Sequence, residues 1–383
     1  MKTLKVAVIG TGFIGKQHIE AIRRIPGTEI VAVIDNNEKM ARSVAEQFFI
    51  SRYYKDYKEL LANTDVDVIH NCTPSAMHYP ISKEVIKSGK HVYCEKPLTL
   101  NSTESEELVK LAKEYKVAAG ANFNYRQNAM VQEMNQRVMN GSIGRLLTVY
   151  GEYMQDWMLF DTDYDWRLDP KLGGESRAIA DIGSHCFDTI QFICGKRITS
   201  VYANLTTVHT VRKKMEKTDG TFSAATGKVL EEIPIRSEDM AYIMVKFEDG
   251  MQGLFHVSQV AAGKKNAFKI NVCGAASSLE WNQERPDKLW IGHRDSGNEE
   301  LYVGAQYMTG EAKKYATLPN GHPVGWADAL RNGIHNFYDS IQNNNYINQN
   351  QNYVTFEDAN YIMKIVEACL RSNQSQKWED VLQ

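Results

Sequence analysis

The segment Val8–Gly15, VIGTGFIG, constrains the fold of this chain more than any other feature. Gly10, Gly12 and Gly15 follow a continuous apolar run, LKVAVIG, which is typical of a strand buried on both faces. Helical apolar spacing follows in FIGKQHIEAIRRI. In this context the first glycine permits a tight turn, the second lets the backbone approach a pyrophosphate, and the third lets the helix pack closely. The segment predicts dinucleotide binding; a glycine-rich turn in an unrelated α/β protein is the alternative.

Asp35 ends the second apolar run, EIVAVID. A carboxylate at this position accepts hydrogen bonds from a ribose 2′-hydroxyl and repels a 2′-phosphate. Asn36 and Asn37 are neutral and no arginine follows directly, so the sequence favours NAD over NADP. The alternative is that Asp35 caps the helix predicted over NNEKMARSV.

The 383 residues are too many for one ordinary core, and two styles of sequence divide them. Buried strands alternate with helices over residues 1–124, which predicts an α/β Rossmann domain with a doubly wound parallel sheet. Longer, partly alternating strands dominate residues 125–383, which predicts an α+β substrate-binding domain with an open, largely antiparallel sheet and a hairpin around EDG. Late helices over about 323–341 and 355–372 could pack back toward the first domain.

Composition excludes several classes of protein. The net charge of −3 leaves no basic surface of the kind that binds nucleic acid, and no apolar run is long enough to span a bilayer. The N-terminal apolar run is short and stops in glycines, so it reads as a strand rather than a signal peptide. Six cysteines without a C-x-x-C pair indicate reduced, buried thiols and a cytoplasmic protein. No cluster has the spacing of metal ligands.

Two further strand ends of the first domain carry candidate site residues. In NCTPSAMH, Thr73, Pro74 and His78 follow the third strand, at the edge where ligands bind in doubly wound sheets. A proline turn followed by a histidine at a helix start is the alternative. In VYCEKPLTL, Lys96 follows the fourth strand, where a partly desolvated lysine could hold a substrate hydroxyl. The alternative is a surface ion pair of Glu95 with Lys96; the bond from Lys96 to Pro97 is a candidate for cis geometry.

Asp181 and His185 form a second candidate constellation. They lie four residues apart near the start of a helix predicted from Ile182, so they share one face of it. A carboxylate beside an imidazole orients the ring and supports its charged form, as in general acid–base catalysis. A capping aspartate followed by a core histidine is the alternative.

VIGTGFIG, TPSAMH, CEKPLTL and DIGSHCFDTIQF, in this order and spacing, resemble the Gfo/Idh/MocA oxidoreductases over nearly the whole chain. The resemblance implies a Rossmann domain and an open-sheet domain with NAD(P) between them. The catalytic residues that it implies are Lys96, Asp181 and His185. The expected cofactor-binding residues are Gly10, Gly12, Phe13, Ile14, Gly15, Asp35, Thr73, Pro74, His78, Glu95, Lys96, Trp166 and Arg167. The expected substrate-binding residues are Lys96, Tyr125, Gln155, Asp181 and His185, with Arg126 and His322 as further candidates.

The expected function is NAD-dependent hydride transfer from a secondary ring hydroxyl of a sugar, glycoside, anhydrosugar or inositol. Gln155 resembles a sugar-contacting glutamine of one sugar dehydrogenase subfamily. The family also implies a homo-oligomer formed through the C-terminal sheet. Two alternatives stay open: an NAD-dependent glycosidase that oxidises its sugar transiently, and a non-catalytic dinucleotide-binding sensor. The joint presence of Lys96 and His185 argues against the sensor.

Overall fold

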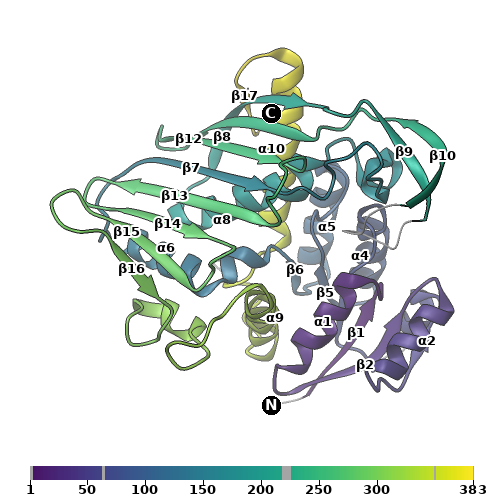
Figure 1. Cartoon of the computed structure of the whole chain (residues 1–383). Helices are drawn as coiled ribbons and strands as arrows, with labels where there is room; N and C mark the ends of the chain where they lie inside the picture. Colours follow the sequence, from purple (N-terminus) through teal and green to yellow (C-terminus); the bar gives the residue numbers. More distant parts are fainter. Residues whose placement is uncertain (1–2, 63–64, 218–225, 349–350, 383) are drawn as a thin grey trace. The chain divides into compact units, whose positions relative to one another are not determined.

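The computed structural model describes residues 3–62, 65–217, 226–348 and 351–382 (Figure 1). The chain folds into two compact units. Unit 1 comprises Met1–Gln127 and Trp326–Met363, and unit 2 comprises Asn128–Gly325 and Lys364–Gln383. The late segment Trp326–Met363 therefore belongs to the unit formed by the N-terminal part of the chain.

Unit 1 contains a six-stranded parallel sheet in the order β3-β2-β1-β4-β5-β6, which confirms the predicted Rossmann architecture. Its strands are β1 (Leu4–Ile9), β2 (Thr28–Ile34), β3 (Tyr53–Tyr54), β4 (Val68–Asn71), β5 (His91–Cys94) and β6 (Ala119–Ala121). Its helices are α1 (Phe13–Arg23), α2 (Glu38–Gln47), α3 (Tyr57–Leu61), α4 (His78–Lys87), α5 (Ser102–Glu114) and α9 (Trp326–Gln342), with short turns η1 (Ser75–Met77) and η2 (Asn124–Gln127). The strand order reverses between β1 and β4, and ligands of such sheets bind outside this point.

Strands of unit 1 are buried on both faces, as their unbroken apolar runs predict. Val6 and Val8 on β1 and Val33 on β2 are wholly buried. Helix α9 packs Leu330 and Phe337 into the same core, which is how the late segment Trp326–Met363 becomes part of unit 1. Strand β3 and helix α3 were not expected, because elements this short leave no apolar period in the sequence.

Unit 2 contains a nine-stranded sheet in the order β16-β15-β14-β13-β7-β12-β11-β8-β17. Its pairs are antiparallel except β7 with β12, so the sheet is mixed but largely antiparallel, as predicted. The strands are β7 (Leu146–Met154), β8 (Ile198–Thr206), β11 (Met240–Phe247), β12 (Gln252–Ser258), β13 (Ala267–Gly274), β14 (Ser278–Asn282), β15 (Lys288–Gly292), β16 (Glu299–Tyr302) and β17 (Glu379–Asp380). The hairpin predicted around EDG joins β11 to β12. Strands β9 (Val211–Lys217) and β10 (Thr226–Pro234) form a separate hairpin.

Helices cover one face of the large sheet and leave the other open. The helical segments of unit 2 are α6 (Ala129–Met139), η3 (Trp166–Leu168), α7 (Pro170–Gly173), η4 (Ile179–Gly183), α8 (Ser184–Cys194) and η5 (Gly310–Tyr315). Helix α10 (Phe356–Ser375) begins in unit 1 and ends in unit 2. Helices α6 and α8 pack against β14 and β7 and lie behind the strands in Figure 1.

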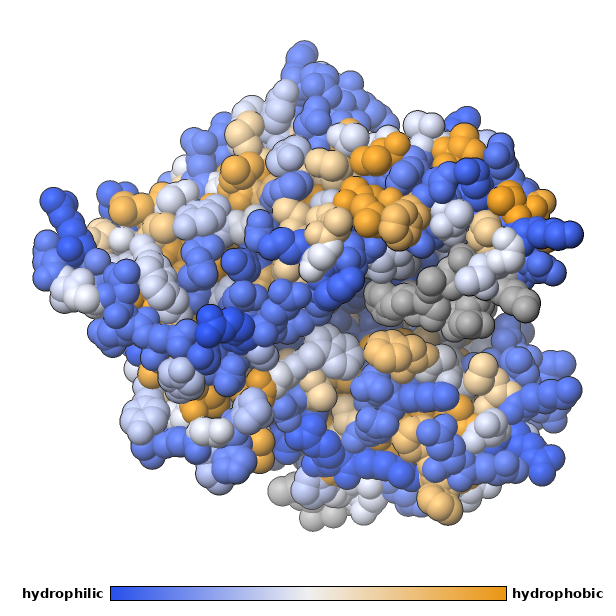
Figure 2. Space-filling view, in the orientation of Figure 1, coloured by the Kyte–Doolittle hydropathy of each residue, from blue (hydrophilic) through white to orange (hydrophobic). Residues whose placement is uncertain are grey.

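The open face carries large apolar side chains. Tyr150, Leu254 and Met244 are paired neighbours on β7, β12 and β11, and they are 48%, 49% and 40% exposed. Figure 2 shows hydrophobic and hydrophilic side chains interspersed on this side of the molecule. Among the described residues, no helix combines the length and apolarity that crossing a membrane requires.

Candidate active site

The glycine turn after β1 has the geometry that a dinucleotide requires. Gly10 has φ +89°, and a Cβ on it would lie 2.5 Å from the carbonyl oxygen of Cys72. A Cβ on Gly15 would lie 1.9 Å from the carbonyl oxygen of Gly10, so α1 can pack this closely only with glycine there. A Cβ on Gly12 would meet no atom within 4 Å. Gly12 and Phe13 are exposed, so the start of α1 is open to an anionic ligand.

Asp35 lies beside this turn, at the carboxyl end of β2. Its Oδ2 accepts hydrogen bonds from the Thr11 N–H (2.9 Å) and the Thr11 hydroxyl (2.8 Å), and its Oδ1 accepts one from the Asn37 N–H (3.0 Å). The cap of α2 is Asn37, which accepts from the Met40 N–H, so Asp35 is not the helix cap of the alternative reading. The residues of the turn and Asp35 fit a dinucleotide. Thr11 was not among the predicted residues, although it lies inside the glycine motif.

His78 contacts the backbone of both segments that follow β4 and β5. It is 1% exposed, its Nδ1 lies 2.7 Å from the Pro97 carbonyl oxygen, and its Nε2 lies 2.8 Å from the Thr73 carbonyl oxygen. Burial lowers the pKa of its imidazole. The Thr73 hydroxyl donates to the Asn71 side chain, and Pro74 is exposed. His78 therefore ties the TPSAMH turn to the segment that carries Lys96, and a cofactor contact of these residues stays a prediction.

Lys96 lies two residues after the end of β5 and is partly buried, and its bond to Pro97 is cis, as predicted. Glu95 is only 6% exposed, so the surface ion pair of the alternative reading does not describe it. Glu95 Oε1 accepts hydrogen bonds from the Asn122 amide (2.6 Å) and lies 2.8 Å from His18 Nε2, and Oε2 accepts the Lys96 N–H (3.2 Å). The carboxylate thus holds the backbone at the lysine.

Two other candidates of unit 1 lie in the turn η2. Tyr125 is 4% exposed and Arg126 is 8% exposed. Arg126 Nη1 lies 3.7 Å from Asp358 Oδ2, at the start of α10. This ion pair gives Arg126 a structural role in unit 1, and substrate contact by Tyr125 stays a prediction.

In unit 2, Asp181 lies in η4, a π-helical turn that leads directly into α8. The regular α-helix begins at Ser184 rather than at Ile182, because the residues up to Gly183 form the π turn. Such turns occur frequently at functional sites. His185 is 6% exposed in the first turn of α8, and its ring centroid lies 6.2 Å from that of Tyr153. The structure therefore places both predicted residues at one junction.

Gln259, just after β12, links Asp181 to Gln155. Its Nε2 donates to Asp181 Oδ2 (2.7 Å) and to Gln155 Oε1 (3.3 Å). Its Oε1 accepts from the Arg177 guanidinium, which also pairs with Asp239. The guanidinium can only donate, so it fixes the orientation of the Gln259 amide. Gln259 was not predicted, because a single glutamine in HVSQV has no spacing that distinguishes it.

Gln155, at the end of β7, extends this polar row. Its Oε1 also accepts from Trp157 Nε1 (2.9 Å), and its Nε2 donates to Asn266 Oδ1 (3.2 Å). The Tyr153 hydroxyl donates to the same Asn266 oxygen (2.6 Å). We call the side chains of Tyr153, Asn266, Gln155, Gln259 and Asp181 the polar row of unit 2.

Trp166 and Arg167 lie beside this row. The Arg167 guanidinium carbon lies 4.5 Å from the centroid of the Trp166 ring and 5.8 Å from that of Trp157. Arg167 Nη1 donates to Asp165 (2.9 Å), and Arg167 Nε lies 3.9 Å from Asp181 Oδ1. The predicted residues Arg167, Gln155 and Asp181 are thus brought into one cluster within unit 2.

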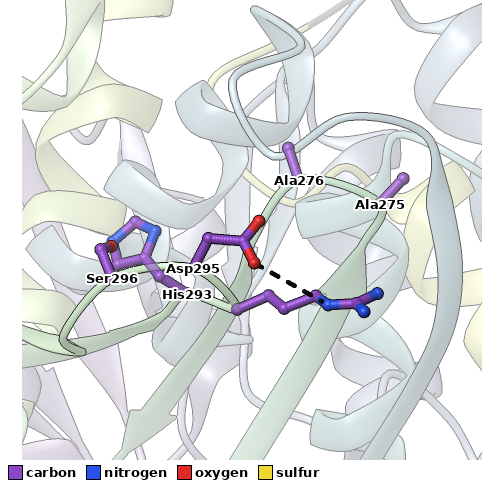
Figure 3. A pocket seen from close by; sticks show the side chains of 6 residues that line it. Ala275, Ala276, His293, Asp295 and Ser296 are labelled. Atoms are coloured by element: carbon purple, nitrogen blue, oxygen red, sulfur yellow. Dashed lines mark ion pairs between the residues drawn. The ribbon is translucent and has the colours of Figure 1, made fainter.

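Two other features lie away from this cluster. His322 is exposed, and its Nδ1 contacts the Pro319 carbonyl oxygen of its own loop (3.0 Å). A hollow of about 590 Å³ lies at the loops after β13 and β15, lined by Ala275, Ala276 and the segment His293–Ser296 (Figure 3). Arg294 and Asp295 there are 94% and 96% exposed, so the hollow is a shallow surface feature. None of the predicted site residues lines it.

The glycine turn, Asp35 and the strand order of unit 1 define a dinucleotide-binding domain, and the large sheet of unit 2 supplies the second domain of a two-domain oxidoreductase. Family models agree with this class. Residues 4–123 match the oxidoreductase family with an NAD-binding Rossmann fold, and residues 131–280 match the GFO/IDH/MocA C-terminal domain. The chain belongs to the Gfo/Idh/MocA oxidoreductases, as its motifs indicate.

Similar proteins match between half and all of the chain. Levoglucosan dehydrogenase of Pseudarthrobacter phenanthrenivorans is 26% identical over 397 aligned residues, covering 100% of this chain and 99% of that protein. Myo-inositol 2-dehydrogenase of Thermotoga maritima is 28% identical over 203 residues, covering 52% of this chain and 58% of that protein. A solved structure of levoglucosan dehydrogenase in complex with NADH and L-sorbose has a TM-score of 0.89 at 25% identity, covering 100% of both chains.

Proposed function

We propose that this enzyme oxidises a secondary ring hydroxyl of a sugar, glycoside, anhydrosugar or inositol and passes the hydride to NAD. The polar row of unit 2 carries the proposal. Its amide, hydroxyl and carboxylate groups are hydrogen-bonded to one another at the ends of neighbouring strands, with the Trp157 indole beside them. Such an arrangement suits a ring that presents several hydroxyls and one C–H face. The full-length similarity to levoglucosan dehydrogenase supports the same substrate class.

The charges around the polar row favour a neutral sugar over a sugar phosphate. Arg167 pairs with Asp165, Arg177 with Asp239, and Lys265 with Asp156. Each of these cations therefore already contacts a carboxylate of unit 2, and Asp239 is shared with the buried Arg212. A phosphate would have to compete with these carboxylates for its counter-charge.

We propose that His185, Asp181 and Lys96 carry the proton transfer that accompanies hydride transfer. His185 takes the proton of the substrate hydroxyl as general base, and Asp181 orients it. The Lys96 ammonium donates a hydrogen bond to the same substrate oxygen and stabilises the negative charge that develops there. NAD, when bound, supplies the acceptor for the hydride. The exposed backbone at Gly12 would approach its pyrophosphate, and Asp35 would accept from its adenosine ribose.

We further propose a cytoplasmic homo-oligomer without nucleic-acid or membrane partners. All six cysteines are free, and five of them are buried, which suits a reducing compartment. The exposed row of Tyr150, Leu254 and Met244 on the open sheet supports association of two copies through this face. Leu254→Glu would then lower the mass measured by light scattering, whereas an unchanged mass would exclude this face.

The function is tested by incubating the enzyme with NAD and either free polyols or chromogenic glycosides. A dehydrogenase produces net NADH with levoglucosan or myo-inositol in proportion to the substrate consumed. The alternative glycosidase would release the chromophore without net NADH. If none of the polyols yields net NADH and none of the glycosides releases its chromophore, both functions are rejected.

A further inference from the structure

A chain of four buried polar groups crosses unit 1 and ends beside Lys96. Glu95 Oε1 lies 2.8 Å from His18 Nε2, His18 Nδ1 lies 2.8 Å from His70 Nδ1, and His70 Nε2 lies 2.7 Å from the Tyr338 hydroxyl. His18 and His70 are wholly buried, Tyr338 is 1% exposed and Glu95 is 6% exposed. Burying four such groups costs free energy unless each one has a partner of the correct kind. We call this set the Glu95–Tyr338 chain.

Glu95 can only accept hydrogen bonds in this environment. The Asn122 amide and the Lys96 N–H both donate to its carboxylate, and His18 Nε2 points to the same Oε1. Three donors converging on one carboxylate favour its ionised form, because a protonated carboxyl would have to place its own hydrogen among them. The pKa of Glu95 is accordingly below its usual value, although burial alone would raise it.

The opposite end of the chain can act as a donor. His70 is the one hydrogen-bond partner of the Tyr338 hydroxyl among the residues that the structure describes. Burial raises the pKa of that phenol well above 10, so the hydroxyl keeps its proton. Burial likewise holds the pKa of His70 well below its ordinary value, so its ring is neutral. A neutral imidazole has one donor and one acceptor nitrogen.

These constraints leave one direction for the chain. Tyr338 donates to His70 Nε2, so the proton of His70 is on Nδ1 and is donated to His18 Nδ1. The proton of His18 is then on Nε2 and is donated to Glu95. We infer that Tyr338 is a positioning residue of this oxidoreductase: its hydroxyl sets the direction of the Glu95–Tyr338 chain, which keeps a neutral His18 donating to an ionised Glu95 and thereby fixes the backbone that presents Lys96.

The reverse direction shows why the hydroxyl matters. It requires a His70 Nε2–H that points at the phenol oxygen and a His18 Nδ1–H that points at His70. Either Glu95 is then protonated and donates to His18 Nε2, or His18 carries both protons and forms an ion pair with Glu95. The Tyr338 proton then needs a different acceptor, and the described residues offer none. Without the hydroxyl this penalty disappears, because an apolar ring opposes neither direction. The two directions then become close in free energy, and the contact of His18 with Glu95 is no longer held in one protonation state.

Other ionisable groups near Glu95 do not supply an equivalent donor. Those that face it are Cys72, His78, Cys94 and Lys96, in addition to the histidines of the chain. Burial raises the pKa of both thiols and lowers that of His78, so these three groups are neutral. Lys96 is the one lysine or arginine among them.

The test compares Tyr338→Phe with the matched control Tyr353→Phe. Both tyrosines are buried in unit 1 against Phe337, but Tyr353 is not a member of the Glu95–Tyr338 chain of hydrogen-bonded side chains. Histidine tautomers are read by two-bond ¹H–¹⁵N spectra of ¹⁵N-histidine protein, with signals assigned through His18→Gln and His70→Gln. We expect His18 to carry its proton on Nε2 and His70 on Nδ1 in the wild type and in Tyr353→Phe. In Tyr338→Phe we expect both tautomers of His70, and a proton on Nδ1 of His18 in part of the molecules.

The measurement of kcat rests on the proposed role of Lys96, whereas the measurement of the histidine tautomers does not. Because one hydrogen bond is at stake, we expect kcat to fall by about two- to tenfold in Tyr338→Phe and to remain unchanged in Tyr353→Phe. A wild-type His18 protonated on Nδ1 overturns the inference, even if Tyr338→Phe does not fold. Identical tautomers in Tyr338→Phe and wild type overturn it as well. Shifted tautomers with unchanged kcat would remove the positioning role.

Discussion

At the scale of single residues, we propose that Asp35 selects NAD over NADP. Its carboxylate is fixed by Thr11 and Asn37 next to the glycine turn. We expect kcat/KM to be higher with NAD than with NADP, and Asp35→Ser to narrow the ratio by roughly tenfold or more, which is about 1.4 kcal/mol. Asp56→Ser, which removes a capping carboxylate elsewhere in unit 1, should leave the ratio unchanged. A wild type that prefers NADP would contradict the role of Asp35.

Lys96 and His185 should be needed for turnover rather than for folding. A general acid–base group contributes about 10²–10⁴-fold, so Lys96→Ala and His185→Ala should each lose roughly that much in kcat. Both variants should keep the circular dichroism spectrum and the NADH affinity of the wild type to within about tenfold. Lys83→Ala and His293→Ala, which break surface ion pairs with Glu107 and Glu299, serve as controls. Near-normal kcat in either site variant would exclude the role given to that residue.

At the scale of elements, we expect two glycines of the turn after β1 to affect different properties: Gly15 the stability of the protein, and Gly12 its affinity for NADH. Gly15→Ala would place a Cβ against the Gly10 carbonyl, so we expect a loss of at least about 2 kcal/mol in the free energy of unfolding. Gly12→Ala meets no protein atom, so stability should be unchanged while NADH affinity falls about tenfold or more. Urea unfolding and NADH fluorescence titration measure the two effects. Equal NADH affinity of Gly12→Ala and wild type would show that the dinucleotide does not approach this turn.

The junction of η4 and α8 depends on Gln259. Gln259→Met keeps the length of the side chain but removes its donor to Asp181 and its acceptor for Arg177. One buried guanidinium N–H is then unpaired, which costs about 1–3 kcal/mol in the free energy of unfolding. If Gln259 orients Asp181, kcat should fall more than the affinity for NADH does. Gln252→Met, at the exposed start of β12, is the control. A variant with wild-type kcat would show that the orientation of Asp181 does not depend on Gln259.

The elements that the sequence predicts well are those whose apolar residues recur at the regular spacing of a helix or a strand. Strand β1 with its glycine turn and α1, and the hairpin of β11 and β12, follow from apolar spacing and turn residues. The π turn η4 has no such signal, since its extra residue shows only in the hydrogen-bond pattern. Thr11, Gln259 and Tyr338 were missed for a related reason. Each gains its partners from segments distant in the sequence, which a single chain without an alignment does not reveal.

At the scale of the whole molecule, buried histidines make stability depend on pH. Burial lowers the pKa of five histidines, which are His70, His78, His91, His256 and His335. The pKa of His91 falls to about 4. His91 Nδ1 accepts the Ala118 N–H, which requires a neutral ring. In the unfolded chain these histidines have their ordinary pKa of about 6.5. The unfolded state therefore binds more protons below about pH 6.5, and stability present above this pH is lost as the pH falls toward 4.

We therefore expect the free energy of unfolding in urea to decrease between pH 7.5 and pH 5. Each histidine contributes a slope of at most about 1.4 kcal/mol per pH unit. His91→Gln keeps an acceptor for the Ala118 N–H but does not titrate, so its slope should be shallower than that of the wild type. Constant stability across this range would contradict the assignment of neutral buried histidines.

The central claim is that this Gfo/Idh/MocA oxidoreductase acts on a ring that presents several hydroxyls. A site built from hydrogen-bonding groups rejects substrates that lack hydroxyls, because its buried polar groups are left unpaired. The most direct measurement is kcat/KM with NAD for levoglucosan, myo-inositol, methyl glucosides, glucose, cyclohexanol and lactate, side by side in one assay of NADH absorbance. We predict that the best cyclic polyol exceeds cyclohexanol and lactate by at least about 100-fold. Cyclohexanol or lactate matching the best polyol would contradict the account.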